Sequence, residues 1–121
     1  MQPRPRILVV DDDVPILVLM KNLLKEFGFE PVVVSSGDEA VEQAKQARPD
    51  LMLIDRNMPG MSGDDVIKAV RSDGIEPFPI LILSGEPIDG RELARIGANG
   101  AVMKPFDVTA LVSEIRSRLG A

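Results

Sequence analysis

Short apolar runs that alternate with helix-forming segments constrain the fold of this chain more than any other feature. Five such runs are predicted to be strands: Ile7–Val10, Phe29–Val34, Leu51–Ile54, Pro79–Leu83 and Ala101–Met103. Most of them are apolar at every position, without the polar alternation of a half-exposed strand. Strands of this kind are buried on both faces, which is typical of a parallel sheet covered by helices.

A segment with helical spacing follows each apolar run. The predicted helices extend from an Asp13 cap to Phe27, from Glu39 to Ala47, from Gly63 or Asp64 to Ser72, from Gly90 to Ile96 and from Val108 to Leu119. Glycines at positions 28 and 97 end two of them. We therefore predict an α/β fold, a doubly wound five-stranded parallel sheet with five helices and right-handed crossovers. The linker at 73–78 is too short to separate domains, so residues 1–121 are predicted to form one domain.

Composition excludes several classes of function. The net charge is −5, whereas proteins that bind nucleic acid directly present a basic face. The chain has no cysteine and no histidine, which excludes disulfides, thiolate chemistry, Ser-His triads and histidine metal sites. No apolar stretch is long enough to span a bilayer, and the run after the basic N-terminus is too short for a signal peptide. We expect a cytoplasmic protein that contacts neither nucleic acid nor membrane.

Polar side chains follow the predicted strands at the point where each strand ends. Asp11 and Asp12 follow the first strand, Asp55 the third, Ser84 the fourth and Lys104 the fifth. Taken singly, each has an ordinary structural explanation as a turn cap, a loop hydroxyl or a surface lysine. Because the carboxyl ends of parallel strands meet at one edge of the sheet, we expect them to converge.

Convergence of these groups would have a chemical consequence. Three carboxylates in one crevice repel each other unless a cation is present. Ligands that are all oxygen select a hard cation, Mg²⁺ or Mn²⁺. A carboxylate nucleophile, a divalent cation, a lysine and a hydroxyl together form a phosphoryl-transfer site, in which Asp55 can be a metal ligand, a base or a nucleophile.

At these motifs the sequence resembles the receiver domain of bacterial response regulators, of the stand-alone chemotaxis type, over essentially the whole chain. The matching stretches are Leu8–Asp12, Ile54–Pro59 with Gly63, Leu83–Gly85, and Gly97–Ala98 followed by Lys104–Phe106. The resemblance implies a flavodoxin-like sheet of order 2-1-3-4-5. It also implies a signalling phosphoacceptor rather than a metabolic enzyme, which takes a phosphoryl group from a histidine kinase or histidine phosphotransfer protein. An output protein, unknown here, would read the phosphorylated state, and the domain would be a monomer or a weak phosphorylation-dependent dimer.

The resemblance assigns roles to the metal-site residues. Asp55 matches the phosphoacceptor, Asp12 the direct Mg²⁺ ligand, and Asp11 a ligand that acts mostly through water. Asn57 matches the position whose backbone carbonyl completes the metal site.

Further roles follow from the last two motifs. Ser84 matches the switch hydroxyl that bonds the phosphoryl group, and Lys104 the lysine that pairs with it. The Lys104–Pro105 peptide bond is expected to be cis. Asn57, Gly85 and Glu86 occupy positions that tune dephosphorylation, so the phosphorylated state is expected to be short-lived.

The sequence departs from the family pattern in three places. The stretch from Ser84 to Lys104 is about half a turn shorter than usual, which predicts a short fourth helix. Leu17 and Val18 are apolar where many relatives are polar. We expect both to be exposed on the first helix, where they dock a kinase. The residues of this helix expected to face the core are Ile16, Met20, Leu23, Leu24 and Phe27. Ala101 replaces a common aromatic residue, whose ring changes rotamer in relatives. Because a methyl group has no rotamer to change, we predict that the short helix at 90–96 is itself the two-state element.

Two other classes of function compete with this interpretation. A phosphohydrolase of the haloacid-dehalogenase kind requires a second acid two residues after the nucleophile, where this chain has Asn57. A degenerate receiver that acts without phosphorylation is favoured by Ala101 but disfavoured by the intact Asp11, Asp12, Asp55 and Lys104.

Overall fold

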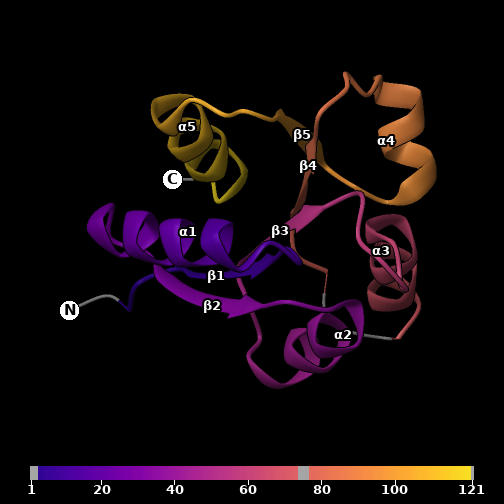
Figure 1. Cartoon of the computed structure of the whole chain (residues 1–121), viewed down its shortest axis with the longest axis horizontal. Coiled ribbons are helices and arrows are strands. Elements are labelled where there is room, and N and C mark those ends of the chain that lie inside the picture. Colours follow the sequence, from indigo (N-terminus) through magenta and orange to yellow (C-terminus); the bar gives the residue numbers. More distant parts are fainter. Residues whose placement is uncertain (1–2, 74–76, 121) are drawn as a thin grey trace.

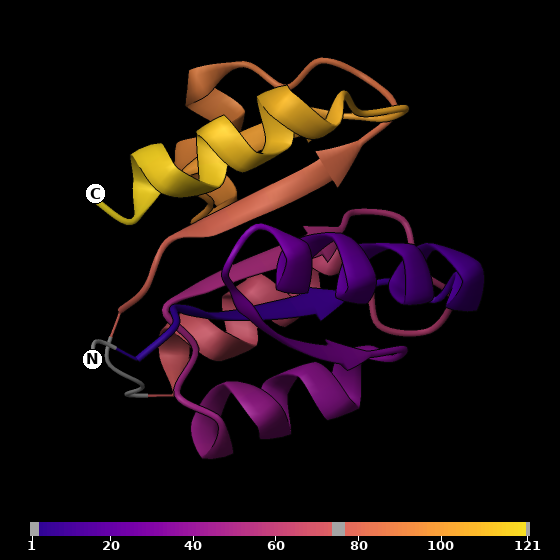
Figure 2. The ribbon, with the colours of Figure 1, turned by 90° about the vertical axis from the view of Figure 1, so that its left-hand side faces the viewer.

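A computed structural model describes residues 3–73 and 77–120 of the chain, and its centre is a five-stranded parallel sheet (Figure 1). The strands are β1 (Arg6–Val10), β2 (Glu30–Val34), β3 (Leu51–Asp55), β4 (Ile80–Ser84) and β5 (Gly100–Met103). Their order is β2-β1-β3-β4-β5 and every neighbouring pair is parallel; the arrowheads of β1, β2 and β4 point the same way in Figure 2. The predicted fold and strand order are thereby confirmed. Part of the predicted linker, residues 74–76, lies outside the described residues.

Five helices cover the two faces of the sheet. They are α1 (Val14–Glu26), α2 (Gly37–Gln46), α3 (Gly63–Ser72), α4 (Gly90–Ile96) and α5 (Val108–Arg118). Helices α1 and α5 lie on one face, and α2, α3 and α4 lie on the other (Figure 1). In the part of the chain that the structure describes, no helix is both long enough and apolar enough to cross a membrane.

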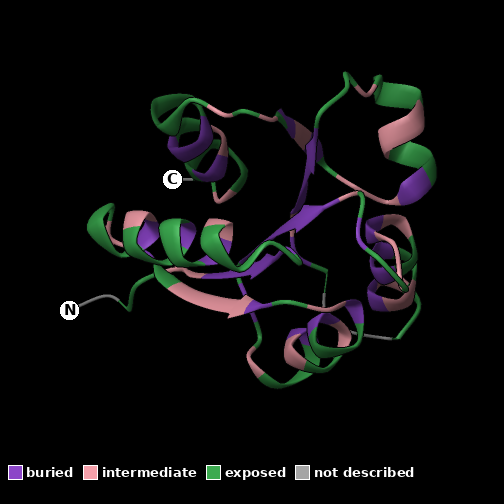
Figure 3. Cartoon of the chain, in the orientation of Figure 1, coloured by how far each residue is buried: buried purple, intermediate pink, exposed green. Residues whose placement is uncertain are grey.

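The two faces of the sheet have separate apolar cores because successive side chains of a strand point to opposite sides. Leu8 and Met52 pack with the α2, α3 and α4 side, whereas Ile7 and Leu51 pack with the α1 and α5 side. Strands β3 and β4 are buried along their whole length (Figure 3). The continuous apolar runs of the sequence are therefore explained by burial of the strands on both faces of the sheet, as predicted.

Side-chain caps set where the helices begin. Asp13 accepts a hydrogen bond from the Ile16 backbone N–H at 3.3 Å, as predicted. Ser36 caps α2 in the same way, so this helix begins at Gly37 rather than at the predicted Glu39. Gly28 and Gly97 adopt φ of 91° and 86°, the left-handed conformation that ends a helix at little steric cost.

The predicted orientation of α1 is wrong at two residues. Leu17 is buried, with 6% of its surface exposed, whereas Phe27 is 38% exposed. Leu17, Met20 and Leu24 form the buried stripe, since spacings of three and four residues place them on one face. Phe27 is the C-cap residue that follows the helix, and the aromatic ring buried at this end is that of Phe29 instead. Val18 is 55% exposed, as predicted.

We predict that Gly63→Ala destabilises the protein while Gly90→Ala does not. Both glycines are the first residue of a helix, α3 and α4 respectively. A Cβ at Gly63 would lie 2.5 Å from the backbone oxygen of Asp55, whereas a Cβ at Gly90 has nothing within 4 Å. The first substitution should lower the free energy of unfolding by about 1–3 kcal/mol, the usual effect of overpacking. Urea unfolding of both variants measures the difference, and equal midpoints would contradict the prediction.

Candidate functional site

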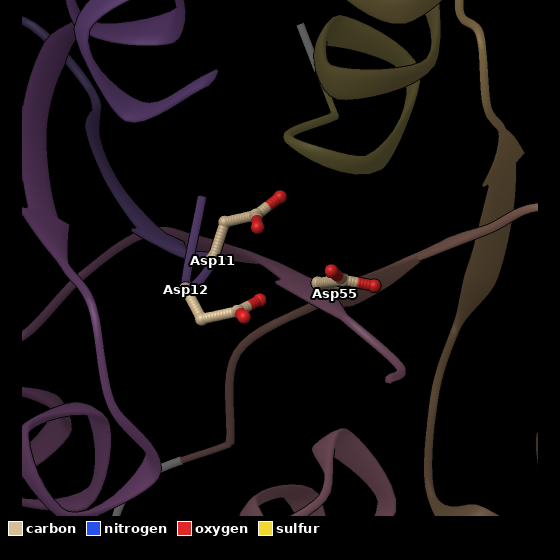
Figure 4. A group of neighbouring side chains, drawn as sticks. All are labelled: Asp11, Asp12 and Asp55. Carbon is tan, nitrogen blue, oxygen red and sulfur yellow. The ribbon is translucent and has the colours of Figure 1, made fainter. Parts of the chain in front are cut away.

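Three carboxylates converge at the carboxyl edge of the sheet (Figure 4). Asp11, Asp12 and Asp55 each offer an oxygen, and these oxygens all lie within 4.8 Å of one another. Val10 pairs with Ile54 in the sheet, so the residues that follow them, Asp11 and Asp55, lie side by side. Both are buried, whereas Asp12 is exposed.

Lys104 joins the two buried carboxylates. Its Nζ lies 3.1 Å from Asp11 Oδ2 and 3.2 Å from Asp55 Oδ2. The Lys104 backbone N–H donates to the Ser84 carbonyl at 2.8 Å, which continues the β4–β5 pairing past the end of the strand. The Lys104–Pro105 peptide bond is cis, as the sequence predicted.

The electrostatic balance of this cluster is unfavourable to the ionised form of Asp55. Burial raises the pKa of Asp55 above 3.8, and the charge of Asp11 adds to this effect. The Asn57 backbone N–H, 3.2 Å from Asp55 Oδ1, and Lys104 act in the opposite direction without cancelling it. Burial lowers the pKa of Lys104, but its hydrogen bonds and charge interactions with Asp11 and Asp55 outweigh burial and raise that pKa.

The donor set fits a hard divalent cation. The three ligand groups are all carboxylates, and a single ammonium group cannot neutralise them. Oxygen-only sites of this charge are typical of Mg²⁺ and Mn²⁺, which retain several waters. Asp12 faces solvent and so leaves one side of the cluster open to such waters.

The Ser84 hydroxyl is buried and bonds to its own loop. It donates to the Glu86 carbonyl at 2.8 Å and accepts from the Glu86 backbone N–H at 3.1 Å. This pair of bonds closes a tight turn directly after β4. Ser84 therefore stands at the predicted edge of the sheet, with its hydroxyl engaged by the loop that leads to α4.

An arginine that the sequence analysis did not single out lies beside the site. Arg56 follows Asp55 directly, and its Nε and Nη2 lie 3.2 and 3.3 Å from the two carboxylate oxygens of Asp64. Its Nη2 also donates to Glu92 Oε1, on α4. No local pattern could have identified a partner this distant in the sequence, although the charge beside the predicted nucleophile was visible.

Comparison with known proteins is consistent with this geometry. The model of the response regulator receiver domain matches residues 7–116. The chain belongs to this family. It is a receiver domain of the kind found in two-component response regulators.

Several relatives resemble this receiver domain over nearly its whole length. The DNA-binding response regulator MtrA of Mycolicibacterium paratuberculosis is 37% identical over 116 residues, 96% of this chain and 52% of the relative. Transcriptional regulatory protein PrrA of Mycobacterium bovis is 35% identical over 117 residues, 95% of this chain and 50% of the relative. The receiver domain thus spans about half the length of these curated relatives. The solved structure of chemotaxis protein CheY4 from Vibrio cholerae has a TM-score of 0.89 and 32% identity, covering 95% of this chain and 98% of that chain.

The remaining predicted residues of the receiver domain lie in two places. Asn57, Gly85 and Glu86 are exposed in the loops around the carboxylates. Val18 is exposed on α1, as predicted. Leu17 is buried, so the prediction that it contacts a partner is wrong. The structure brings Asp11, Asp12, Asp55 and Lys104 together and leaves the Ser84 hydroxyl in its own turn.

We predict that Asp55→Asn stabilises the unphosphorylated domain at neutral pH by about 1 kcal/mol, the size of one net polar interaction. Because the pKa of Asp55 is raised in the folded state, its proton binds more tightly there than in the unfolded chain. The contribution of this carboxyl to stability therefore decreases as the pH rises above 3.8.

The measurement is urea unfolding without divalent cations at several pH values. The difference between wild type and Asp55→Asn should shrink as the pH falls toward and below 3.8, because the Asp55 carboxyl becomes protonated first in the folded state and then in the unfolded state. Asp12→Asn, at the exposed member of the cluster, is the matched control and should have a smaller effect. A variant less stable than wild type at neutral pH would contradict the electrostatic description.

Proposed function

We propose that this receiver domain accepts a phosphoryl group on Asp55 from the phosphohistidine of a histidine kinase or histidine phosphotransfer protein. The observation that carries the proposal is the contact between Lys104 and the buried Asp55 carboxylate, beside the carboxylates of Asp11 and Asp12. A carboxylate that only capped a turn would not need a lysine drawn in from β5. Membership of the receiver family supports the same role for these positions.

In the proposed transfer an Asp55 oxygen attacks phosphorus, and a P–O bond forms as the P–N bond to the imidazole breaks. The imidazole leaves with the electron pair of that bond. The Lys104 ammonium group, 3.2 Å from Asp55 Oδ2, can donate to an oxygen of the transferring group and offset its charge. Water later attacks the phosphorus, which releases inorganic phosphate and regenerates the carboxylate.

Asp11, Asp12 and Asp55 would hold the Mg²⁺ or Mn²⁺ ion, with the backbone carbonyl of Asn57 as a further ligand implied by the family. When bound, the cation offsets the negative charge of the carboxylates and of the phosphoryl oxygens. The residues of this chain orient the carboxylate: the Asn57 N–H and Lys104 contact different oxygens of Asp55 and so fix its plane.

Ser84 would transmit the phosphorylated state. To bond a phosphoryl oxygen, its hydroxyl must give up the Glu86 carbonyl at 2.8 Å, and the turn that leads to α4 then loses one of its closing bonds. Asn57 and Glu86 are both exposed, and we propose that they influence the attacking water.

The proposed partners follow from this role. A kinase or phosphotransfer protein supplies the phosphoryl group, and an output protein reads the switched surface. MtrA is named a DNA-binding response regulator and PrrA a transcriptional regulatory protein, but each is about twice as long as the part that this chain matches. We propose that residues 1–121 act as one receiver unit whose output depends on protein contacts.

We expect ³²P from labelled acetyl phosphate to be incorporated into the wild-type protein and not into Asp55→Asn. The label should be stable in acid and labile in base, as an acyl phosphate is, and should require Mg²⁺ or Mn²⁺. Asp12→Asn should label slowly and need more cation. Incorporation into Asp55→Asn at the wild-type rate would refute the assignment of the phosphoacceptor.

We expect Val18→Glu to slow phosphoryl transfer from a histidine kinase that labels the wild-type protein, with acetyl phosphate still effective. Val14 and Val18 are both exposed and lie one helical turn apart on α1, where they form a small apolar patch. Leu19→Glu is the matched control, because Leu19 is 52% exposed against 55% for Val18 but points to another side of α1. Equal loss with both donors, or equal loss in both variants, would reject docking at this patch.

A further inference from the structure

Helix α4 is attached to the rest of the domain by little apolar surface. It has seven residues, of which Ile96 is the buried one. Helix α3 beside it buries Val66, Ile67 and Val70 (Figure 1). A helix this short is marginal without tertiary contacts, so polar contacts must contribute much of what positions α4.

Two arginines supply these polar contacts, one at each end of α4. At its C-terminal end, Arg71 of α3 donates to the Gly97 carbonyl at 3.1 Å and to Asn99 Oδ1 at 2.9 Å. At its N-terminal end, Arg56 donates to Glu92 while its other contacts bind it to Asp64 of α3. Arg56 thus joins the turn after the phosphoacceptor strand to α3 and α4.

Glu92 occupies a helix position from which its side chain could bond the backbone of the cap residue and not Arg56. Asp89 caps α4 and accepts from the Glu92 backbone N–H at 2.8 Å, which makes Glu92 the third residue of the helix. A glutamate there commonly turns back to the N–H of the cap residue and closes a capping box. The Glu92 carboxylate instead contacts Arg56 through Oε1, and Arg95 Nη2 lies 3.6 Å from the same oxygen. Glu92 can therefore release Arg56 without losing all polar partners.

We propose that Arg56 is a positioning residue, a latch that holds the N-terminal end of α4 against α3, and that α4 moves when the Arg56–Glu92 bridge opens. Arg71 keeps the other end attached, so the movement is a swing about Gly97. The trigger rests on the proposed function: phosphorylated Asp55 draws Ser84 out of its turn with Glu86, and α4 begins at Gly90, four residues after that turn. This device needs no aromatic side chain at position 101, where the chain has Ala101.

The first test uses the unphosphorylated protein and so does not depend on phosphorylation. Hydrogen exchange of the Leu93 amide, which bonds the Asp89 carbonyl at 3.0 Å, should become about two- to fivefold faster in Glu92→Gln, as expected for loss of an ion pair that water can reach. The Asn99 amide, beyond Arg71, should not change. Glu114→Gln is the matched control, because Glu114 is also 34% exposed and also pairs with an arginine, Arg118.

If Arg56 and Glu92 contact each other directly, the effects of substituting them on hydrogen exchange should not add. Arg56→Gln should accelerate exchange at Leu93 to a similar extent, and the double variant should exchange no faster than either single variant. Unchanged exchange in Glu92→Gln, equal acceleration in Glu114→Gln, or additive effects in the double variant would each overturn the latch.

The second test adds Mg²⁺ and beryllofluoride, which stands in for the phosphoryl group. Exchange at Leu93 in the wild-type protein should rise to the level of Glu92→Gln, and the variant should show little further rise. If amide shifts near Asp55 show that beryllofluoride has bound but exchange at Leu93 is unchanged, opening of the latch by phosphorylation is overturned. If wild-type protein takes no label from acetyl phosphate while the first test succeeds, the proposed function fails and the bridge stands.

Discussion

The ion pairs between Lys104 and the carboxylates of Asp11 and Asp55 are the interactions on which the rest of the site depends. An ionised carboxylate is costly to bury without a partner, and Asp11 has no exposed surface. Lys104 directly follows β5, which is the third strand along from β1 and the second from β3, so only the parallel register of the sheet brings these charges together. The apolar runs of the strands fix that register, and the site is a consequence of it.

These ion pairs also leave the cluster short of positive charge. One ammonium group faces two buried carboxylates, with a third carboxylate beside them, and the pKa of Asp55 stays raised despite Lys104. The same deficit makes the cluster suited to a divalent cation and makes Asp55 hold its negative charge at a cost. A carboxylate in this environment gains from any change that places positive charge near it, such as the binding of a divalent cation.

The sequence predicted those features that depend on local pattern or on the order of strands. The strands and helices could be predicted from runs of aliphatic residues, an aspartate cap and two glycines that end helices. The order of the strand ends then predicted that the carboxylates and Lys104 meet at one edge of the sheet. The rotation of α1 could not be predicted, because almost every residue from Val14 to Leu24 is apolar and the stripe has no sharp boundary. The partners of Arg56 and Arg71 are distant in sequence and depend on the distance between α3 and α4, which no local pattern specifies.

Helices α3 and α5 are held to the sheet by buried apolar side chains, whereas α4 is held largely by polar contacts. This difference explains why a conformational change in this fold would concentrate at α4. Moving α3 or α5 would expose fully buried aliphatic side chains such as Ile67 or Leu111, at about 1.5–3 kcal/mol for each. Moving the N-terminal end of α4 leaves Ile96 in place and exchanges hydrogen bonds of Glu92 and Arg56 for bonds with water or with nearby charged groups. Such exchanges have small net free energies because both states are hydrogen-bonded. Under the proposed function, a phosphoryl group bonded to the Ser84 hydroxyl would supply that much without disrupting either core.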